Sequence, residues 1–332
     1  MKVQTIEFSN WATKALAQYG IDEHKVKFIQ HHDNITFQVT PHSHKERCLL
    51  RIHKPLTESF VDMRQKPIAI NSELLWLEAL HRDTALTVQQ PIGNKDGSFV
   101  TLITTAQGST IPCTLLRWIE GEMVSQDAPL TLGLAEALGG IVAHLHNHVV
   151  RWEIPNGFLR PAYDLEYFRQ RMMLLSSGVS QGIITSQAHS IIQETAKACI
   201  ESLASIHINN DSWGLVHTDL HRGNCLVYHN EMRPIDFALC GFSYFVYDLG
   251  GTLAGMPKEL RQVCINGYLK HRQLSENAIR LLEASFLLSR IGAYIFMLPN
   301  TAEHSWLYER IPRFVAQECQ LFLSNQSLLF SI

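Results

Sequence analysis

A run of acidic and amide side chains between residues 215 and 250 has the composition and spacing of a reactive site. In "LVHTDLHRGNCLVYHNEMRPIDFALCGFSYFVYDLG", apolar runs and turns separate Asp219, Asn224, Asp236 and Asp248. Mg²⁺ takes oxygen ligands such as one or two carboxylates, together with water and substrate phosphates. An aspartate can also orient an attacking hydroxyl and accept its proton, so this set has the parts that phosphoryl transfer requires.

The same residues allow a purely structural interpretation. Asp and Asn side chains often cap backbone turns, and an isolated Asp-x4-Asn spacing is a short pattern with many false matches. Asp236, however, lies on the segment that is expected to return beside Asn224. This third acid in the expected neighbouring strand favours the chemical interpretation.

The elements around these residues predict how they are positioned. "GLVHT" is expected to be a strand, "DLHRGN" a loop, "CLVYHN" a second strand, "NEM" a turn and "RPIDFALC" a third strand. A hairpin folded at "NEM" brings positions 224 and 236 near each other. Asp219, at the start of the loop, then faces an incoming hydroxyl.

The rest of the chain divides into a β-rich part and a helical part. Residues 4–20 and 68–83 have helical spacing of apolar residues, and β-rich runs occupy 25–30, 34–40 and 47–53. Two more strands are expected within 88–103 and 113–122, around a turn at 94–97. Beyond Gly121 the periodicity is helical, and residues 215–250 are the one clear β island. We therefore predict an α+β protein with an N-lobe (1–116), a linker (117–122) and a helical C-lobe (123–332).

Composition excludes several classes of protein. The chain of 332 residues is long enough for two lobes, and its net charge of -3 offers no bulk attraction for nucleic acid or an anionic membrane. Seven scattered cysteines without a CxxC pair indicate reduced thiols. No signal peptide or membrane span is evident. We expect a cytoplasmic protein, monomeric or homodimeric, without nucleic-acid or membrane partners.

Histidines offer a separate candidate for a metal site. His144 and His148 are four residues apart on an expected helix, which is ligand spacing, with His146 between them on another face. A third ligand is not evident from the sequence, so we interpret these histidines as packing residues rather than as a transition-metal site.

Several motifs together resemble a known family. "HTDLHRGNCLV" followed by "IDFALCGFSYFVYDLG" resembles the phosphotransferase family of aminoglycoside phosphotransferases, choline kinases and type II homoserine kinases. "NITFQV", "CLLRIHKP", "INSELLWLEAL", "TLLRWIEGE" and "LGGIVAHLH" occur in the same order as in that family. The resemblance implies a two-lobed protein-kinase-like fold, with a small antiparallel β-rich N-lobe and a larger helical C-lobe.

The resemblance also implies roles for single residues. Asp219 would be the catalytic aspartate, and Asn224 and Asp236 would hold magnesium. Asp248 in "YDLG" would brace the catalytic loop through backbone hydrogen bonds, and His217 would support the same loop by packing and hydrogen bonding.

On the nucleotide side, the resemblance places Arg51 at the position of a phosphate-contacting lysine and Glu73 as its helix partner. Backbone groups of Arg117 and Ile119 would bind adenine. Two features depart from the family pattern: Arg51 replaces the usual lysine, and "QHHDNITF", at the position of the phosphate-covering loop, contains no glycine.

These observations predict an ATP- and Mg²⁺-dependent phosphotransferase that moves the γ-phosphate to a hydroxyl of a small metabolite or antibiotic. GTP stays open as the donor. Residues 250–332 carry eight Lys or Arg against six Glu and no Asp, which favours a neutral or anionic acceptor over a polycationic aminoglycoside. A Ser/Thr protein kinase of the same fold and a non-catalytic nucleotide-binding pseudokinase are the alternatives.

Overall fold

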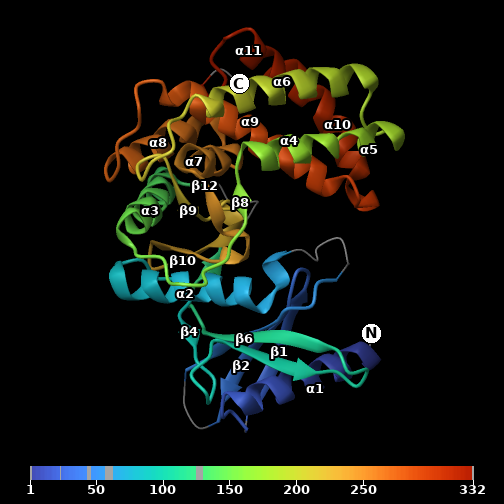
Figure 1. Cartoon of the computed structure of the whole chain (residues 1–332), viewed down its shortest axis with the longest axis vertical. Helices are drawn as coiled ribbons and strands as arrows, with labels where there is room; N and C mark the ends of the chain where they lie inside the picture. Colours follow the sequence, from blue (N-terminus) through green and yellow to red (C-terminus); the bar gives the residue numbers. More distant parts are fainter. Residues whose placement is uncertain (1, 23, 43–45, 57–62, 125–129, 331–332) are drawn as a thin grey trace. The chain divides into compact units, whose positions relative to one another are not determined.

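The computed structural model describes residues 2–22, 24–42, 46–56, 63–124 and 130–330 (Figure 1). The chain forms two compact units. The first comprises residues 1–121, 153–161 and 235–238, and the second comprises residues 122–152, 162–234 and 239–332. Short segments from the later part of the sequence thus belong to the first unit. The functional division at residues 116 and 122 stays a prediction.

An antiparallel sheet forms the centre of the first unit. Its elements are α1 (Lys2–Gln18), β1 (His24–His31), β2 (Ile35–Pro41), β3 (Cys48–Ile52), α2 (Pro67–Asp83), β4 (Pro91–Ile92), β5 (Val100–Thr104) and β6 (Thr110–Arg117). Five of the six strands follow the order β1-β2-β3-β6-β4, and the sixth, β5, pairs with β6. α1 packs Trp11 and Leu16 into the same apolar core as Phe37 and Leu50 of the sheet (Figure 1).

Helix α2 belongs to the first unit and buries one of its faces. Pro67 occupies the start of the helix, where its missing N–H costs nothing. Ile70, Glu73, Leu74 and Leu77 are all buried, at the spacing of three and four residues that defines a helix face. This spacing places the Glu73 carboxylate among apolar residues, where it requires a charged partner.

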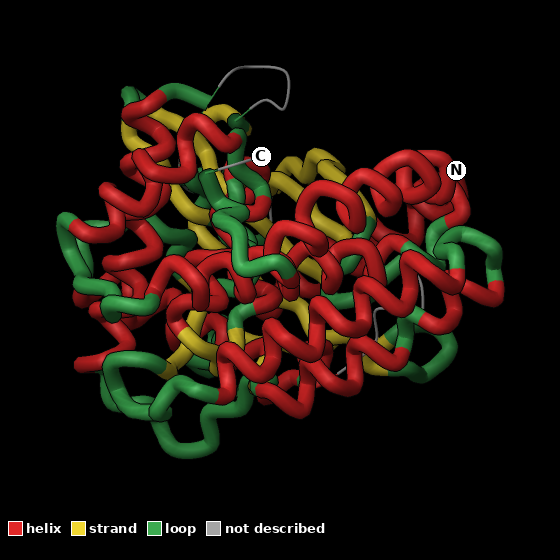
Figure 2. The backbone as a smooth tube through the Cα atoms, turned by 90° about the horizontal axis from the view of Figure 1, so that it is seen from above, coloured by secondary structure: helices red, strands yellow, loops and turns green. Residues whose placement is uncertain are grey.

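Helices make up most of the second unit. Figure 2 shows the helices of the whole chain in red. Its helices are α3 (Leu132–Arg151), α4 (Leu165–Met173), α5 (Ser176–Ser180), α6 (Ser186–Ala204), α7 (Phe245–Ala254), α8 (Lys258–Leu269), α9 (Ala278–Met297), α10 (His304–Arg313) and α11 (Gln320–Leu323). A π-helical segment, Phe314–Cys319, lies between α10 and α11.

Two small sheets complete the second unit. One has the order β11-β10-β7, from β11 (Glu231–Pro234), β10 (Cys225–Tyr228) and β7 (Glu122–Met123). The other has the order β8-β12-β9, from β8 (Ala162–Tyr163), β12 (Gly241–Tyr244) and β9 (Trp213–Val216). The prediction that residues 215–250 are the one clear β island was therefore incomplete, since two two-residue strands outside that range, β7 and β8, also contribute to these sheets.

The hairpin itself differs in detail from the prediction. Its turn is His229–Asn230, with φ of 47° and 64°, rather than "NEM". Positive φ at both central positions is typical of the type I′ turn that suits the twist of a hairpin. The expected third strand also ends early, at Pro234, and residues 237–239 form a 3-10 turn. Proline lacks the N–H that would continue a ladder.

Close packing between α3 and α8 brings His146 of α3 beside Tyr268 of α8. A Cβ atom on Gly139 would overlap the carbonyl oxygen of Cys264, and one on Gly267 would overlap that of Glu136. Only glycine allows the two helix backbones to approach this closely.

Among the described residues, no single helix is long and apolar enough to cross a membrane. One pair of helical segments joined by a sharp bend, Ala278–Met297 with Thr301–Leu323, meets the criterion for a membrane span by length and composition alone.

Candidate active site

The loop after β9 begins with an unusual backbone conformation at Thr218. Its φ is 67°, a left-handed conformation that is rare for a β-branched residue. Two hydrogen bonds hold it there: the Thr218 N–H donates to Asp248 Oδ1 at 2.6 Å, and its Oγ1 donates to the Leu239 carbonyl oxygen at 2.9 Å. Strained backbone of this kind persists only where its surroundings enforce it, and it is concentrated at functional sites.

Asp219 follows this turn, and its carboxylate is oriented by the other end of the loop. Asn224 Nδ2 donates to both the carbonyl oxygen and Oδ2 of Asp219, each at 2.9 Å. The second carboxylate oxygen lies 3.7 Å from His221 Nε2. Because the Asp219 side chain is still 41% exposed, it is both oriented and accessible to an incoming hydroxyl.

His221 has a structural task in the same loop. Its Nδ1 accepts a hydrogen bond from the Gly223 N–H at 3.0 Å and caps the short helical turn Arg222–Asn224. An accepting Nδ1 places the proton of the neutral ring on Nε2, the nitrogen that faces Asp219. His221 thus both caps the turn and lies beside the carboxylate of Asp219, the candidate catalytic group.

Asn224 has an oxygen that suits a metal ion. Both of its Nδ2 bonds go to acceptor atoms of Asp219, which fixes the orientation of the amide and leaves Oδ1 as its acceptor atom. Asp236 has φ of 63° and follows the hairpin, whose last pair is Cys225 with Pro234. Asn224 and Asp236 belong to different units, so their joint role as magnesium ligands stays a prediction.

Asp248, at the first turn of α7, lies at the centre of a buried network. Its Oδ1 accepts from Thr218, and its Oδ2 is 3.0 Å from His146 Nε2. His146 Nδ1 is in turn 3.0 Å from the Tyr268 hydroxyl. Burial lowers the pKa of His146 despite the nearby carboxylate, so the ring is neutral and donates from Nε2 while Tyr268 donates to Nδ1. Tyr268 is thereby connected to the residue that precedes Asp219.

Sequence reasoning missed the roles of His146 and Tyr268. These side chains are 102 and 122 positions away from their partners Asp248 and His146. His146 and Tyr268 meet because α3 and α8 pack closely at their glycines. The only signal in the sequence was the polar His146 within an apolar helix. His217, which is fully buried, lies close to the same loop through its Nδ1, 3.4 Å from the Asp219 backbone nitrogen.

In the first unit, Arg51 and Glu73 form an ion pair, as the sequence predicted for these two residues. Arg51 Nη1 donates to Glu73 Oε1 at 2.7 Å, and both side chains are buried. Arg51 Nε donates to Thr114 Oγ1 at 3.2 Å, whereas Nη2 is buried with no acceptor among the described residues. His53 Nε2 also lies 3.0 Å from Thr114 Oγ1, and burial beside Arg51 holds its pKa well below the usual range.

The residues expected to contact adenine lie at the end of β6 and just beyond it. The Arg117 N–H donates to the Gln90 carbonyl oxygen at 2.8 Å, and its guanidinium pairs with Glu46. The Arg117 N–H is thus already paired, and the role of Arg117 in adenine binding stays a prediction. Ile119 is buried, and the Trp118 ring stacks with Arg47, 5.5 Å from the ring centroid.

The histidines of α3 do not converge on one point. His144 packs on His271 with ring centroids 4.2 Å apart, His146 binds Asp248, and His148 packs on Trp152. Within the described ranges, no group of three or more His, Cys, Asp or Glu side chains is placed to hold a metal ion.

Known proteins share this architecture. The microcompartment-associated aminopropanol kinase superposes with a TM-score of 0.78, at 24% identity over 96% of this chain and 99% of its own. An amicoumacin kinase in complex with AMP-PNP, Ca²⁺ and Ami gives a TM-score of 0.74, at 19% identity over 95% of each chain. Likeness at this identity defines the fold, and the predicted α+β protein-kinase-like fold is confirmed.

Sequence comparison identifies the family. Amicoumacin kinase of Bacillus subtilis (strain 168) is 22% identical over 237 residues, which are 71% of this chain and 64% of that relative. The match thus spans less than two thirds of the relative's length. The phosphotransferase enzyme family matches residues 25–282. This chain belongs to that family, and the resemblance drawn from its motifs is confirmed.

Proposed function

We propose that this protein is a kinase that transfers the γ-phosphate of ATP to a hydroxyl group of a small molecule, with a divalent metal ion. The observation that carries the proposal is Asp219, whose partly exposed carboxylate accepts one hydrogen bond from Asn224 Nδ2, while its backbone carbonyl oxygen accepts another from the same amide. Asp219 would align the acceptor hydroxyl and accept its proton. Positioning of this kind is a main contribution that a protein makes to phosphoryl transfer.

The buried Arg51 supports a role in nucleotide binding. Its Nη2 donor lacks an acceptor among the described residues, and a buried charged donor is costly when unpaired. A phosphate oxygen would supply the acceptor, while Glu73 would hold the guanidinium in place. Arginine offers a fork of donors suited to phosphate, so its presence in place of lysine is compatible with ATP use.

The oxygens of Asn224 and Asp236 fit a hard divalent cation. When bound, the cation would neutralise charge on the phosphate oxygens. The chain's own contribution is to point Asn224 Oδ1 away from Asp219, because the Nδ2 of the same amide holds the Asp219 carboxylate. One side chain would thus serve both the metal and the candidate catalytic group.

The acceptor is proposed to be a small hydroxyl compound, because the relatives are named as kinases of amicoumacin and aminopropanol. We further propose a monomer or homodimer in the cytoplasm, without nucleic-acid or membrane partners. A protein acceptor and a non-catalytic nucleotide-binding role are the competing hypotheses.

A panel of hydroxyl compounds assayed by ADP release tests the proposal. Amino alcohols, sugars, amino acids and antibiotics should be included, with a Ser/Thr peptide library as a separate arm. Turnover is expected with a small molecule and Mg-ATP, and Asp219→Asn should reduce kcat by about 10²-fold or more. Asp96→Asn, which changes an exposed turn carboxylate, is the matched control. Undiminished turnover in Asp219→Asn would overturn the role of Asp219.

A thermal-shift measurement separates the kinase from a scaffold that binds no nucleotide. A ligand at about 100 times its dissociation constant adds roughly 2.7 kcal/mol of stability. A shift with Mg-ATP together with ADP release supports the proposal. The absence of both would contradict it.

A further inference from the structure

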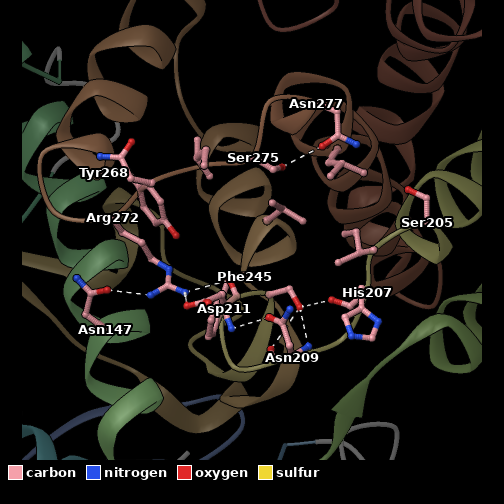
Figure 3. A pocket seen from close by; sticks show the side chains of 16 residues that line it. Asn147, Ser205, His207, Asn209, Asp211, Phe245, Tyr268, Arg272, Ser275 and Asn277 are labelled. Atoms are coloured by element: carbon pink, nitrogen blue, oxygen red, sulfur yellow. Dashed lines mark hydrogen bonds and ion pairs between the residues drawn. The ribbon is translucent and has the colours of Figure 1, made fainter.

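A pocket in the second unit lies apart from the candidate catalytic loop. It has a volume of about 760 Å³, within the range of small-molecule sites, and its walls come from α3, the α6–β9 connection, the start of α7 and the residues around the α8–α9 connection (Figure 3). None of residues 217–224 lines it. Its occupant would therefore bind without touching Asp219.

Arg272 supplies the positive charge of this pocket. Its guanidinium donates to Asn147 Oδ1 at 2.9 Å and to the Asp211 carbonyl oxygen at 3.0 Å, and it lies over the Phe245 ring (Figure 3). These acceptors carry no formal charge. The Asp211 carboxylate is 3.5 Å away, longer than the 2.7–2.9 Å of a strong charge-assisted bond.

The exposure of the two partners differs strongly. The Arg272 side chain is 10% exposed, whereas that of Asp211 is 87% exposed. An exposed carboxylate at this distance is a weak partner, because water and salt screen it. A guanidinium removed from water and held mainly by neutral acceptors favours an additional anionic partner.

The other polar lining residues are amides, hydroxyls and one imidazole. Arg272 and Asp211 are the arginine and the carboxylate of the lining, and amide and hydroxyl side chains together with His207 surround them. Val246 and Leu281 contribute apolar wall. This combination suits a small metabolite with one anionic group and several hydroxyls, because hydroxyls can both donate to and accept from amides.

The pocket also contacts the network that holds the catalytic loop. Tyr268, part of its lining, bonds to His146, and Phe245, also in the lining, stacks on the same imidazole at 4.4 Å between ring centroids. His146 binds Asp248, which holds the Thr218 N–H. Arg272 lies over the Phe245 ring, so a ligand on Arg272 would act on His146 through Phe245.

We propose that this pocket binds a small hydroxylated anion, a phosphate ester or a carboxylate, through Arg272, and that binding stabilises the Thr218 turn through Phe245, Tyr268 and His146. The anion would replace the Asp211 carboxylate beside Arg272. The site is distinct from the proposed nucleotide and acceptor sites, and its occupancy can be measured whether or not the protein is a kinase.

Calorimetric titration with glycerol 3-phosphate, malate and neutral glycerol tests the binding. The two anions distinguish a phosphate ester from a carboxylate, and glycerol isolates the contribution of charge. We expect at least one anion to bind and glycerol not to bind. Arg272→Gln should weaken binding by about tenfold or more, and Asp211→Asn should strengthen it by about two- to fivefold, because it removes a competing carboxylate.

Arg169 and Glu166 form a matched control pair, since their charged atoms are also 3.5 Å apart and both are exposed. Arg169→Gln and Glu166→Gln should leave binding unchanged. If Arg272→Gln fails to fold, Asp211→Asn, an exposed substitution, carries the test. Equal binding of glycerol, or unchanged affinity in Asp211→Asn, would overturn the assignment of an anion site. So would complete displacement of the anion by Mg-ATP, because that result places it at the nucleotide site.

Hydrogen exchange of the Thr218 amide tests the connection to the loop. The bound anion should slow exchange of a peptide covering residues 215–220, and Tyr268→Phe, which keeps the ring but removes the hydroxyl, should reduce that protection. Binding without added protection in the native sequence would overturn the coupling. Neither measurement requires turnover, so an inactive protein would contradict the proposed function and leave this inference intact.

Discussion

Replacing Asp248 by Asn is expected to loosen the candidate catalytic loop by a defined amount. The carboxylate accepts from two donors, the Thr218 N–H at 2.6 Å and the buried His146 Nε2 at 3.0 Å. An amide has one acceptor oxygen and one NH₂ group, so it can satisfy Thr218 while it presents a donor to His146. His146 can respond by moving its proton to Nδ1, with the Tyr268 hydroxyl then accepting.

The expected cost follows from this rearrangement. Asp248→Asn keeps a bond to each neighbour but replaces two charge-assisted bonds by neutral ones, which should cost about 1–3 kcal/mol. Asp248→Ala leaves both donors unpaired and should cost about 3–5 kcal/mol. Because Thr218 precedes Asp219, Asp248→Asn should also lower kcat by about 10- to 100-fold, since a small misplacement of a reacting group has effects of that size.

Glu283→Gln provides the matched control. Glu283 is a buried carboxylate whose Oε1 accepts from the Leu328 N–H at 2.6 Å, remote in sequence from the loop. Chemical denaturation and steady-state kinetics should show that both variants are destabilised, but that only Asp248→Asn lowers kcat. An equal effect of Asp248→Asn and Asp248→Ala on stability, or an unchanged kcat in Asp248→Asn, would refute the two-bond argument.

Two further predictions concern the first unit. Arg51→Gln should lower the unfolding free energy by about 3–5 kcal/mol, since it leaves the Glu73 carboxylate buried without its partner, and Arg51→Gln with Glu73→Gln should recover part of that loss in a double-mutant cycle. His53 has a lowered pKa in the folded state, so between that value and about 6.5 only the unfolded chain binds its proton. Stability should therefore fall as the pH is lowered through this window, by up to about 1.4 kcal/mol per pH unit, and His53→Gln should flatten the slope in denaturation midpoints measured at about pH 7.5 and about pH 5.5. An equal slope in His53→Gln would assign the pH dependence to other groups.

Local patterns were sufficient to predict most elements of the first unit. Strands expected at 25–30, 34–40 and 47–53 occur at His24–His31, Ile35–Pro41 and Cys48–Ile52, and the helix expected at 68–83 is Pro67–Asp83. Apolar periodicity and turn residues act over a few positions, so a single sequence contains that information. The hairpin turn was misplaced because His229–Asn230 lacks the glycine that usually marks a positive φ.

The sequence by itself determined the family and the candidate chemical residues, because Asp219 and Asn224 lie within one loop whose spacing is a local property of the chain. Only the tertiary structure revealed that Asn224 holds Asp219 by its amide, and that Thr218 is held in a left-handed conformation. The contact of His146 with Tyr268 joins residues 122 positions apart. Such pairs depend on how helices pack, and helix packing is set by the whole core rather than by any short segment.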